Sequence, residues 1–163
     1  MTCDDWARLQ DFLIGQFRLG RWSAHDHEHW RRVEHYGLHL GRLVGGDLEV
    51  IRLFAWLHDS QRYDEGHDPE HGPRAADLAR QLCGSWFQLE PERLDLLVQA
   101  CRDHERGWTS SHPTVGACWD ADRLDLDRVA RVPEERYLST REAARLALLI
   151  PYRRWKRVGI PCS

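Results

Sequence analysis

In this 163-residue chain, several histidine and aspartate residues are placed so that their side chains could bind a metal ion. Successive residues of a helix lie about 100° apart, so the face on which each side chain falls can be worked out from the sequence. His29 falls at the centre of an apolar stripe, and His58 points with the core residues of its segment while Asp59 flanks it. Asp122 also falls in the middle of an apolar face.

Four such residues on three expected helices need a common explanation. A buried carboxylate is costly unless it is paired or holds a cation, and an ion pair of Asp122 with Arg32 or Arg123 would satisfy only that one residue. Mutual neutralisation around a metal explains all four more simply. Imidazole and carboxylate ligands suit a divalent Mn, Fe, Zn or Ni ion, and a carboxylate-rich site also admits Mg.

Other histidines give a weaker signal. His71 and His104 each line up with apolar residues, and either one alone favours a core histidine bonded to a backbone carbonyl. His35 and His39 have the i, i+4 spacing of a surface metal site, but they fall toward the polar side of their segment. A solvated helix face is the plainer interpretation of that pair.

The elements that must position these side chains are expected to be helices, because apolar residues recur at helical spacing and alternating patterns are scarce. The predicted helices are Asp4–Phe17, His27–Val44, Leu48–Ser60, Glu70–Leu82, Pro91–Asp103, Val115–Val129 and Thr140–Arg157. Gly45 is expected to end the helix over residues 27–44, and Asp47 is expected to be the N-cap of the helix that follows. The sequence therefore predicts one all-α domain over residues 1–163, a bundle of about six to seven helices. Its motif-bearing core spans about residues 23–129 and its C-terminal helix about residues 140–157.

Composition excludes several classes of protein. The hydrophobic fraction is 42%, enough to bury a core. The 23 basic and 26 acidic residues give a formal net charge of −3, which argues against a strongly basic nucleic-acid-binding protein and gives no strong nucleic-acid signal. No apolar run approaches the roughly 18 to 20 residues that cross a bilayer, so no membrane partner is expected.

The five cysteines form an odd, widely spaced set without a Cys-x-x-Cys pair. A disulfide scaffold or a thiolate zinc site is therefore not expected, and a reducing cytoplasm is the expected compartment. The acidic, amphipathic start of the chain does not resemble a signal peptide.

Three short motifs resemble, in order, the successive motifs of the HD superfamily of metal-dependent phosphohydrolases: His29-Trp30-Arg31-Arg32-Val33, Leu57-His58-Asp59 and Asp120-Ala121-Asp122-Arg123-Leu124. Each motif alone is common, but their order and separation make the set specific. The resemblance runs over about residues 23–129 and implies an all-α bundle.

The resemblance also implies roles for individual residues. It implies metal ligation by His29, His58, Asp59 and Asp122. Some members of the superfamily hold a second ion with histidines between the doublet and the last aspartate. The corresponding places are occupied by His71 and His104, and Asp59 would then bridge two ions.

Further residues are candidates for substrate binding and proton transfer. His25 resembles a histidine ahead of the first motif in related small proteins, and Arg62 follows the doublet by three as a basic residue often does. Both would contact the substrate phosphate, with Arg32 and Arg74 as further candidates. Asp59 or Asp103 would accept the proton of the attacking water.

The expected activity is hydrolysis of a small-molecule phosphoester, with a nucleotide favoured by family analogy. A bound ion lowers the pKa of its water toward about 7 and so supplies the nucleophile. The loops Tyr63–Asp68 and Gly107–Pro113 would flank the pocket, where Trp108 either stacks on a base or packs. A di-iron oxygenase and a non-enzymatic regulatory module with a structural metal are the alternatives. The chain lacks the Gly-Tyr-Pro motif of the cyclic-dinucleotide branch and the charged pair of alarmone hydrolases, and its substrate, metal and oligomeric state stay open.

Overall fold

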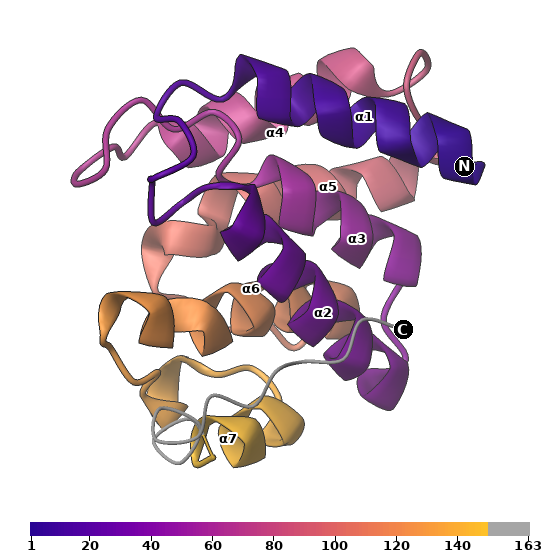
Figure 1. Ribbon diagram of the computed structural model, residues 1–163. Coiled ribbons are helices and arrows are strands. Elements are labelled where there is room, and N and C mark those ends of the chain that lie inside the picture. Colours follow the sequence, from indigo (N-terminus) through magenta and orange to yellow (C-terminus); the bar gives the residue numbers. More distant parts are fainter. Residues whose placement is uncertain (150–163) are drawn as a thin grey trace.

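The structure is a computed structural model that describes residues 1–149. Over this range the chain forms seven α-helices and three short 3-10 helices and no β-strand, which confirms the predicted all-α class (Figure 1). The α-helices are α1 Cys3–Gln16, α2 His27–Val44, α3 Leu48–Leu57, α4 His71–Leu82, α5 Pro91–Asp103, α6 Pro113–Leu124 and α7 Arg141–Ala147. The 3-10 helices are η1 His104–Arg106, η2 Asp125–Val129 and η3 Glu135–Tyr137.

Helix α3 forms the centre of the bundle. Its residues from Leu53 to Leu57 are all buried, as expected of a helix that is apolar nearly all round. It contacts α2, α5 and α6, and also α1 and α4. Figure 1 shows α1 across one end of the bundle and α7 at the opposite end, beyond α6. The start of α2 and the end of α5 meet the C-terminal end of α3, because His29 and His104 reach the two residues that follow it.

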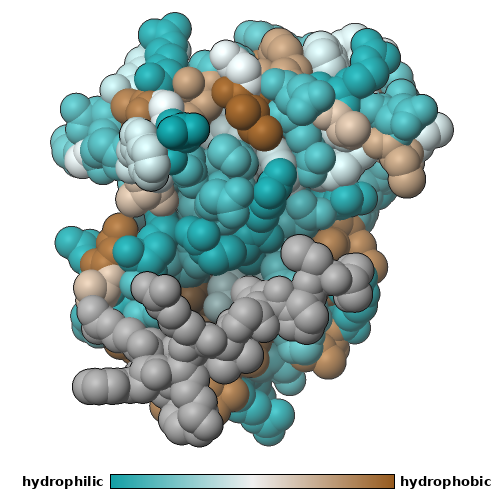
Figure 2. Space-filling view, viewed as in Figure 1, coloured by the Kyte–Doolittle hydropathy of each residue, from teal (hydrophilic) through white to brown (hydrophobic). Residues whose placement is uncertain are grey.

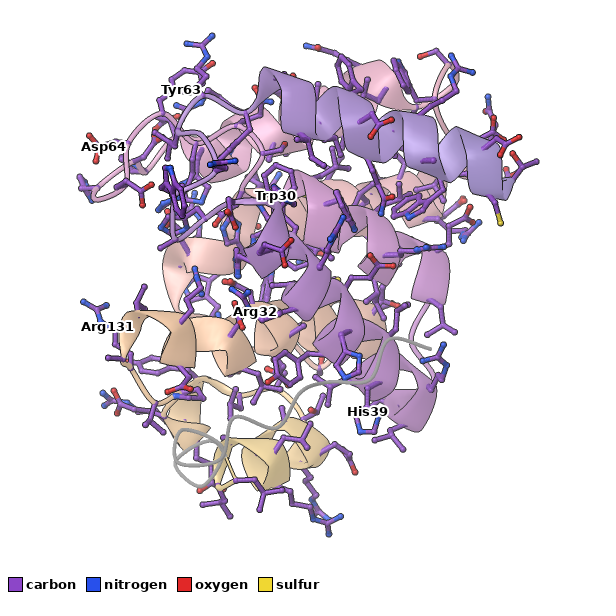
Figure 3. The ribbon with its side chains drawn as sticks, in the orientation of Figure 1. Trp30, Arg32, His39, Tyr63, Asp64 and Arg131 are labelled. Carbon is purple, nitrogen blue, oxygen red and sulfur yellow. The ribbon has the colours of Figure 1, made fainter. Side chains whose placement is uncertain are left out.

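Aromatic side chains fill the core between α1, α2 and α3. Trp30 is fully buried and meets Trp56 and Phe17 edge to face, with ring centroids 5.8 and 5.2 Å apart. Figure 3 shows Trp30 in the interior of the bundle, where α2 begins. Packing of this kind fixes the first turn of α2, which carries His29.

The connection between α2 and α3 confirms the predicted stop and cap. Gly45 ends α2 with a left-handed φ of 73°, which glycine adopts without a Cβ penalty. Asp47 then caps α3, and its carboxylate accepts from the backbone N–H groups of Glu49 and Val50.

Three predicted boundaries were wrong by two residues or more. Helix α3 ends at Leu57 rather than Ser60, because tight i, i+3 bonds from Ser60 N to Leu57 O and from Arg62 N to Asp59 O replace the α-helical pattern. The helix predicted over residues 115–129 begins instead at Pro113, which suits a first turn, and it changes to the 3-10 helix η2 at residue 125.

Smaller differences occur elsewhere. The first helix begins and ends one residue earlier than predicted, and α4 begins at His71 rather than Glu70. Helix α7 begins at Arg141 rather than Thr140, which is its N-cap, and it ends at Ala147. Residues 150–157 of the predicted C-terminal helix lie outside the described residues.

The described part of the chain contains no helix that is both long and apolar enough to cross a membrane. Hydrophilic residues gather across the middle of the face shown in Figure 2. Cys3, Cys83, Cys101 and Cys118 are free thiols, and Cys162 lies outside the described residues.

Candidate metal centre

Residues from α2, α3 and α6 converge where these helices meet. His29 lies in the first turn of α2, His58 and Asp59 follow the last residue of α3, and Asp122 lies in α6. The Nε2 atoms of His29 and His58 are 3.1 Å apart, and Asp122 Oδ1 lies 3.4 and 3.7 Å from them. Asp59 Oδ2 lies 3.6 and 3.8 Å from the same two nitrogens. We call these four residues the first metal group.

A second cluster adjoins the first and shares Asp59 with it. The Nε2 atoms of His71 and His104 are 2.9 Å apart, and Asp59 Oδ1 lies 3.1 and 3.6 Å from them. We call His71, His104 and Asp59 the second metal group. The two oxygens of one carboxylate therefore face different histidine pairs, which is the arrangement that could bridge two ions.

A glycine allows the second pair of histidines to meet. His71 is the first residue of α4 and His104 directly follows α5. A Cβ on Gly72 would come 2.8 and 2.9 Å from the backbone oxygens of Arg102 and Cys101. Only glycine therefore lets the start of α4 lie directly against the end of α5, with the two imidazoles side by side.

The second ring nitrogen of each histidine is held by an oxygen. Nδ1 of His58, His71 and His104 lies 3.0, 2.6 and 2.7 Å from the backbone carbonyl oxygen three residues earlier. Nδ1 of His29 lies 2.7 Å from Asp125 Oδ2. Because these oxygens only accept, each Nδ1 must donate, and a neutral ring then presents an Nε2 lone pair. Anchoring of this kind orients histidines that bind metals.

Whether a metal ion fits here depends on the Nε2 lone pairs of the two histidine pairs. In each pair, two Nε2 acceptors point at one another at about hydrogen-bond distance, and with both rings neutral neither nitrogen has a proton to share. Carboxylates adjoin both pairs and add negative charge. A cation between the members of a pair satisfies both lone pairs, so the described residues are compatible with divalent metal ions.

The electrostatics of the cluster also favour a cation. Although burial opposes it, the histidines around Asp59, among them His104 and the donor His25, hold the pKa of this carboxyl well below its usual range. The pKa values of His29 and His104, one histidine of each pair, are raised: burial lowers them, but neighbouring carboxylates outweigh it. A proton on one ring is the smallest cation that each pair can share.

Asp122 behaves like Asp59. Burial raises its pKa, but the hydrogen bond with His29 holds the pKa of this carboxyl well below its usual range. Burial lowers the pKa of His58 in turn. The first metal group therefore presents two ionised carboxylates to one point, and the second presents one.

A cavity of about 930 Å³ lies beside both groups. Asp59, His104 and Asp122 contribute to its wall. Residues 65–67 of the loop after α3 also line it, next to Tyr63 and Asp64 in Figure 3, as does the segment after α6, where the figure labels Arg131. Five arginines line it: Arg62, Arg106, Arg123, Arg128 and Arg131.

Two of the residues predicted to bind phosphate lie at this cavity. His25 Nδ1 donates to Asp59 Oδ2 at 2.6 Å. Arg62 is buried with its Nε 3.6 Å from Asp59 Oδ1, and its Nη2 donates to Glu105 Oε1 at 3.1 Å. The Nε and Nη1 atoms of Arg62 have no hydrogen-bond partner among the described residues.

The other three candidates do not line the cavity and are engaged elsewhere. Arg32 donates to Asp125 at 2.7 Å rather than to Asp122. Arg74 donates to the carboxylate of Asp68 at 2.6 Å and to a backbone oxygen. Asp103 accepts from Arg102 and Arg106, the residues on its own turn of helix.

The remaining surface candidates stay apart from the centre. His35 and His39 are exposed on α2, as Figure 3 shows for His39, in agreement with a solvated face. Trp108 is 54% exposed and lies under the guanidinium of Arg106, so it is not packed in the core.

Sequence reasoning missed Asp125, Arg123 and Arg128 as parts of this site. Asp125 joins His29 to Arg32 and is 5% exposed. Its spacing was the available signal, because it follows Asp122 by three residues. Residues i and i+3 share one face where an α-helix tightens into a 3-10 helix.

Comparison with known proteins gives one match. The sequence family described as HD domain matches residues 27–146, a range that includes both metal groups. Neither the curated proteins nor the solved structures contain a match to the chain.

Proposed function

We propose that this chain, which belongs to the HD domain family, is a metal-dependent phosphohydrolase that acts on a small phosphoester, with a nucleotide as the favoured substrate. The observation that supports this most directly is Asp59. Its two oxygens face two histidine pairs whose lone pairs need cations, and the same residue lies in the wall of a cavity large enough for a small-molecule substrate.

The first metal group would hold one divalent ion and the second metal group another, with Asp59 between them. Metal ions at such a site polarise a phosphoryl oxygen and lower the pKa of a bound water, which makes that water a nucleophile at neutral pH. The protein's part is to fix the donors, since every histidine involved is anchored at Nδ1.

Arg62 would bind the phosphoryl group that is cleaved. Its Nε and Nη1 groups are buried donors without partners among the described residues, beside Asp59. A phosphate oxygen would satisfy them and offset the charge that develops as the bond breaks. Glu105 holds the third nitrogen and so fixes the plane of the guanidinium.

His25 would move the proton. Its Nδ1 donates to Asp59, which leaves its Nε2 as the ring atom able to exchange a proton with a ligand in the cavity. The sequence suggested Asp59 or Asp103 as the proton acceptor and His25 as a phosphate ligand. Asp59 would be held by the metal ions, and Asp103 is occupied by two arginines and lies outside the cavity lining, so we assign proton transfer to neither.

The test is metal replacement followed by activity measurement. The protein is stripped with a chelator, reloaded separately with Mn, Mg, Ni, Fe, Co or Zn, and assayed on a generic phosphomonoester and a nucleotide panel. We expect activity only after reloading. His58→Ala should remove bound metal and activity, whereas the exposed His39→Ala should retain both.

Activity of the stripped protein would overturn the proposal. Oxygen consumption that requires iron, without phosphate release, would instead favour the di-iron oxygenase, because carboxylate-bridged histidine pairs also suit two irons.

A further inference from the structure

Glu105 contacts both the second metal group and the arginine that would bind phosphate. Its Oε2 atom lies 3.3 Å from Nδ1 of His71, and its Oε1 atom accepts from Nη2 of Arg62 at 3.1 Å. It also directly follows His104 in the chain and lines the cavity. The carboxylate of Glu105 therefore lies on the Nδ1 side of a histidine whose Nε2 atom belongs to the second metal group.

The first metal group contains the same arrangement. Nδ1 of His29 lies 2.7 Å from Oδ2 of Asp125, and Oδ1 of Asp125 accepts from Nε of Arg32 at 2.7 Å. In each group, one histidine thus faces a carboxylate whose other oxygen is held by an arginine. The contact of Glu105 is therefore part of a repeated pattern, although the two groups are built from different helices.

The two carboxylates differ in how closely they approach their histidine. The side chain of Asp125 is 7% exposed, whereas that of Glu105 is 44% exposed. Nδ1 of His71 is bonded to the backbone oxygen of Asp68 at 2.6 Å, so the longer contact with Glu105 acts mainly through its negative charge. Because water screens a half-exposed charge, we expect Glu105 to affect its ion less than Asp125 does.

The backbone on both sides of Glu105 is held in place. The backbone oxygen of His104 accepts from Nη2 of Arg123 at 3.4 Å. The side chain of Arg106 donates to the carboxylate of Asp103 at 2.9 Å. The carboxylate of Glu105 therefore extends from a backbone position that the fold itself determines.

We propose that Glu105 is a positioning residue for the second ion. Its carboxylate orients the ring of His71 and makes the Nε2 atom of that ring a stronger donor to a metal ion. Arg62 holds the carboxylate through one nitrogen, so its two other nitrogens stay available to a phosphate oxygen. This inference rests on the proposed function, because it concerns the second of the two ions.

The test measures the affinity of Mn²⁺ for Glu105→Gln, which keeps the length of the side chain but removes its charge. Wild type and variant are titrated with Mn²⁺ in competition with a chelator of known affinity, and His104→Ala identifies the binding step of the second metal group. We expect the affinity of the second ion to fall about tenfold and that of the first to stay unchanged. Glu134→Gln is the matched control, because Glu134 is also exposed and lines the cavity but pairs with Arg136.

The outcomes separate the inference from the function. Wild-type affinity for both ions in Glu105→Gln, or a single Mn²⁺ bound by the wild type, would overturn the inference and leave the proposed function standing. An equal loss in Glu134→Gln would assign the effect to the general charge of the cavity and overturn the inference, as would an equal fall for both ions in Glu105→Gln. If the wild type binds no Mn²⁺, the proposed function fails together with the inference.

Discussion

The two metal groups share one aspartate but are built differently. In the first, His29 is anchored by the buried carboxylate of Asp125, and two carboxylates, Asp59 and Asp122, adjoin the histidine pair. In the second, both histidines are anchored by backbone carbonyls, and Asp59 is the carboxylate facing their Nε2 atoms. The first group therefore concentrates more negative charge on its ion.

Their positions in the fold also differ. The first metal group joins α2, α3 and α6, which pack together in the centre of the bundle. The second joins the beginning of α4 to the end of α5, two helices that also pack closely. Since ligand charge raises the affinity for a cation, we expect the first ion to bind tightly and the second to exchange.

Replacing the shared residue has the largest expected effect. Asp59→Asn should remove both ions and reduce phosphoester hydrolysis by about a thousandfold or more, because both groups lose a charged ligand. Metal content by mass spectrometry and the rate of hydrolysis measure this. Asp11→Asn, an exposed residue of α1, is the control. Full metal content in Asp59→Asn would contradict the bridging position.

Separate replacements distinguish the two groups. Asp122→Asn should lose the first ion and abolish activity, whereas His104→Ala should lower the metal content from two ions to about one. The physical reason is that His104 contributes to the second group alone. A titration of metal content against Mn²⁺ concentration measures both variants. Equal losses in the two variants would show that the ions bind as one unit.

Asp125 gives a smaller and more selective effect. Asp125→Asn keeps the shape but weakens the acceptor for His29, so the affinity of the first ion should fall about 10- to 100-fold. Competition with a chelator of known affinity measures the change. The second ion should keep its affinity, and an equal fall for both would refute the separate anchoring.

The smallest effect concerns the loop that carries the second group. Asp68 holds Arg74 with its carboxylate and His71 with its backbone oxygen. Although burial opposes it, hydrogen bonds from Arg74 and from the Tyr63 N–H lower the pKa of Asp68 to about 2. Its ionised form therefore stabilises the fold above its ordinary pKa near 3.8, and this stabilisation is lost as the pH falls toward 2.

Thermal unfolding of wild type and Asp68→Asn between pH 2 and pH 6 measures this contribution. The difference in melting temperature should be largest above about pH 4 and shrink toward pH 2. Asp64→Asn, in the exposed part of the same loop, is the control. A difference that does not change with pH would contradict the charge-based explanation.

Hydrophobic periodicity predicted the fold well, because a helix packed in a core shows apolar residues at helical spacing in its sequence. The predicted ranges of α2 and α5 coincide with the structure, since Gly45 and Pro91 mark a stop and a start that the backbone requires. The error at residue 125 arose because a 3-10 turn advances about 120° per residue rather than 100°, which a helical count does not detect.

The site shows the limit of the same reasoning. Helical faces brought His29, His58 and Asp122 to one interior point, and the structure places them together. The helical face of an arginine does not determine where its guanidinium lies, because the long side chain can turn toward any carboxylate nearby. Arg32 and Arg74 therefore lie with Asp125 and Asp68, away from the cavity.

Gly72 connects the packing of two helices to the chemistry between them. Its missing side chain sets how closely α4 approaches the carbonyl oxygens of α5, and that approach sets the gap between two imidazoles. Loading or withdrawing one ion should therefore tighten or loosen a helix–helix contact. Amide protons in the first turn of α4 would report it by exchanging with deuterium more slowly in the loaded protein than in the stripped one.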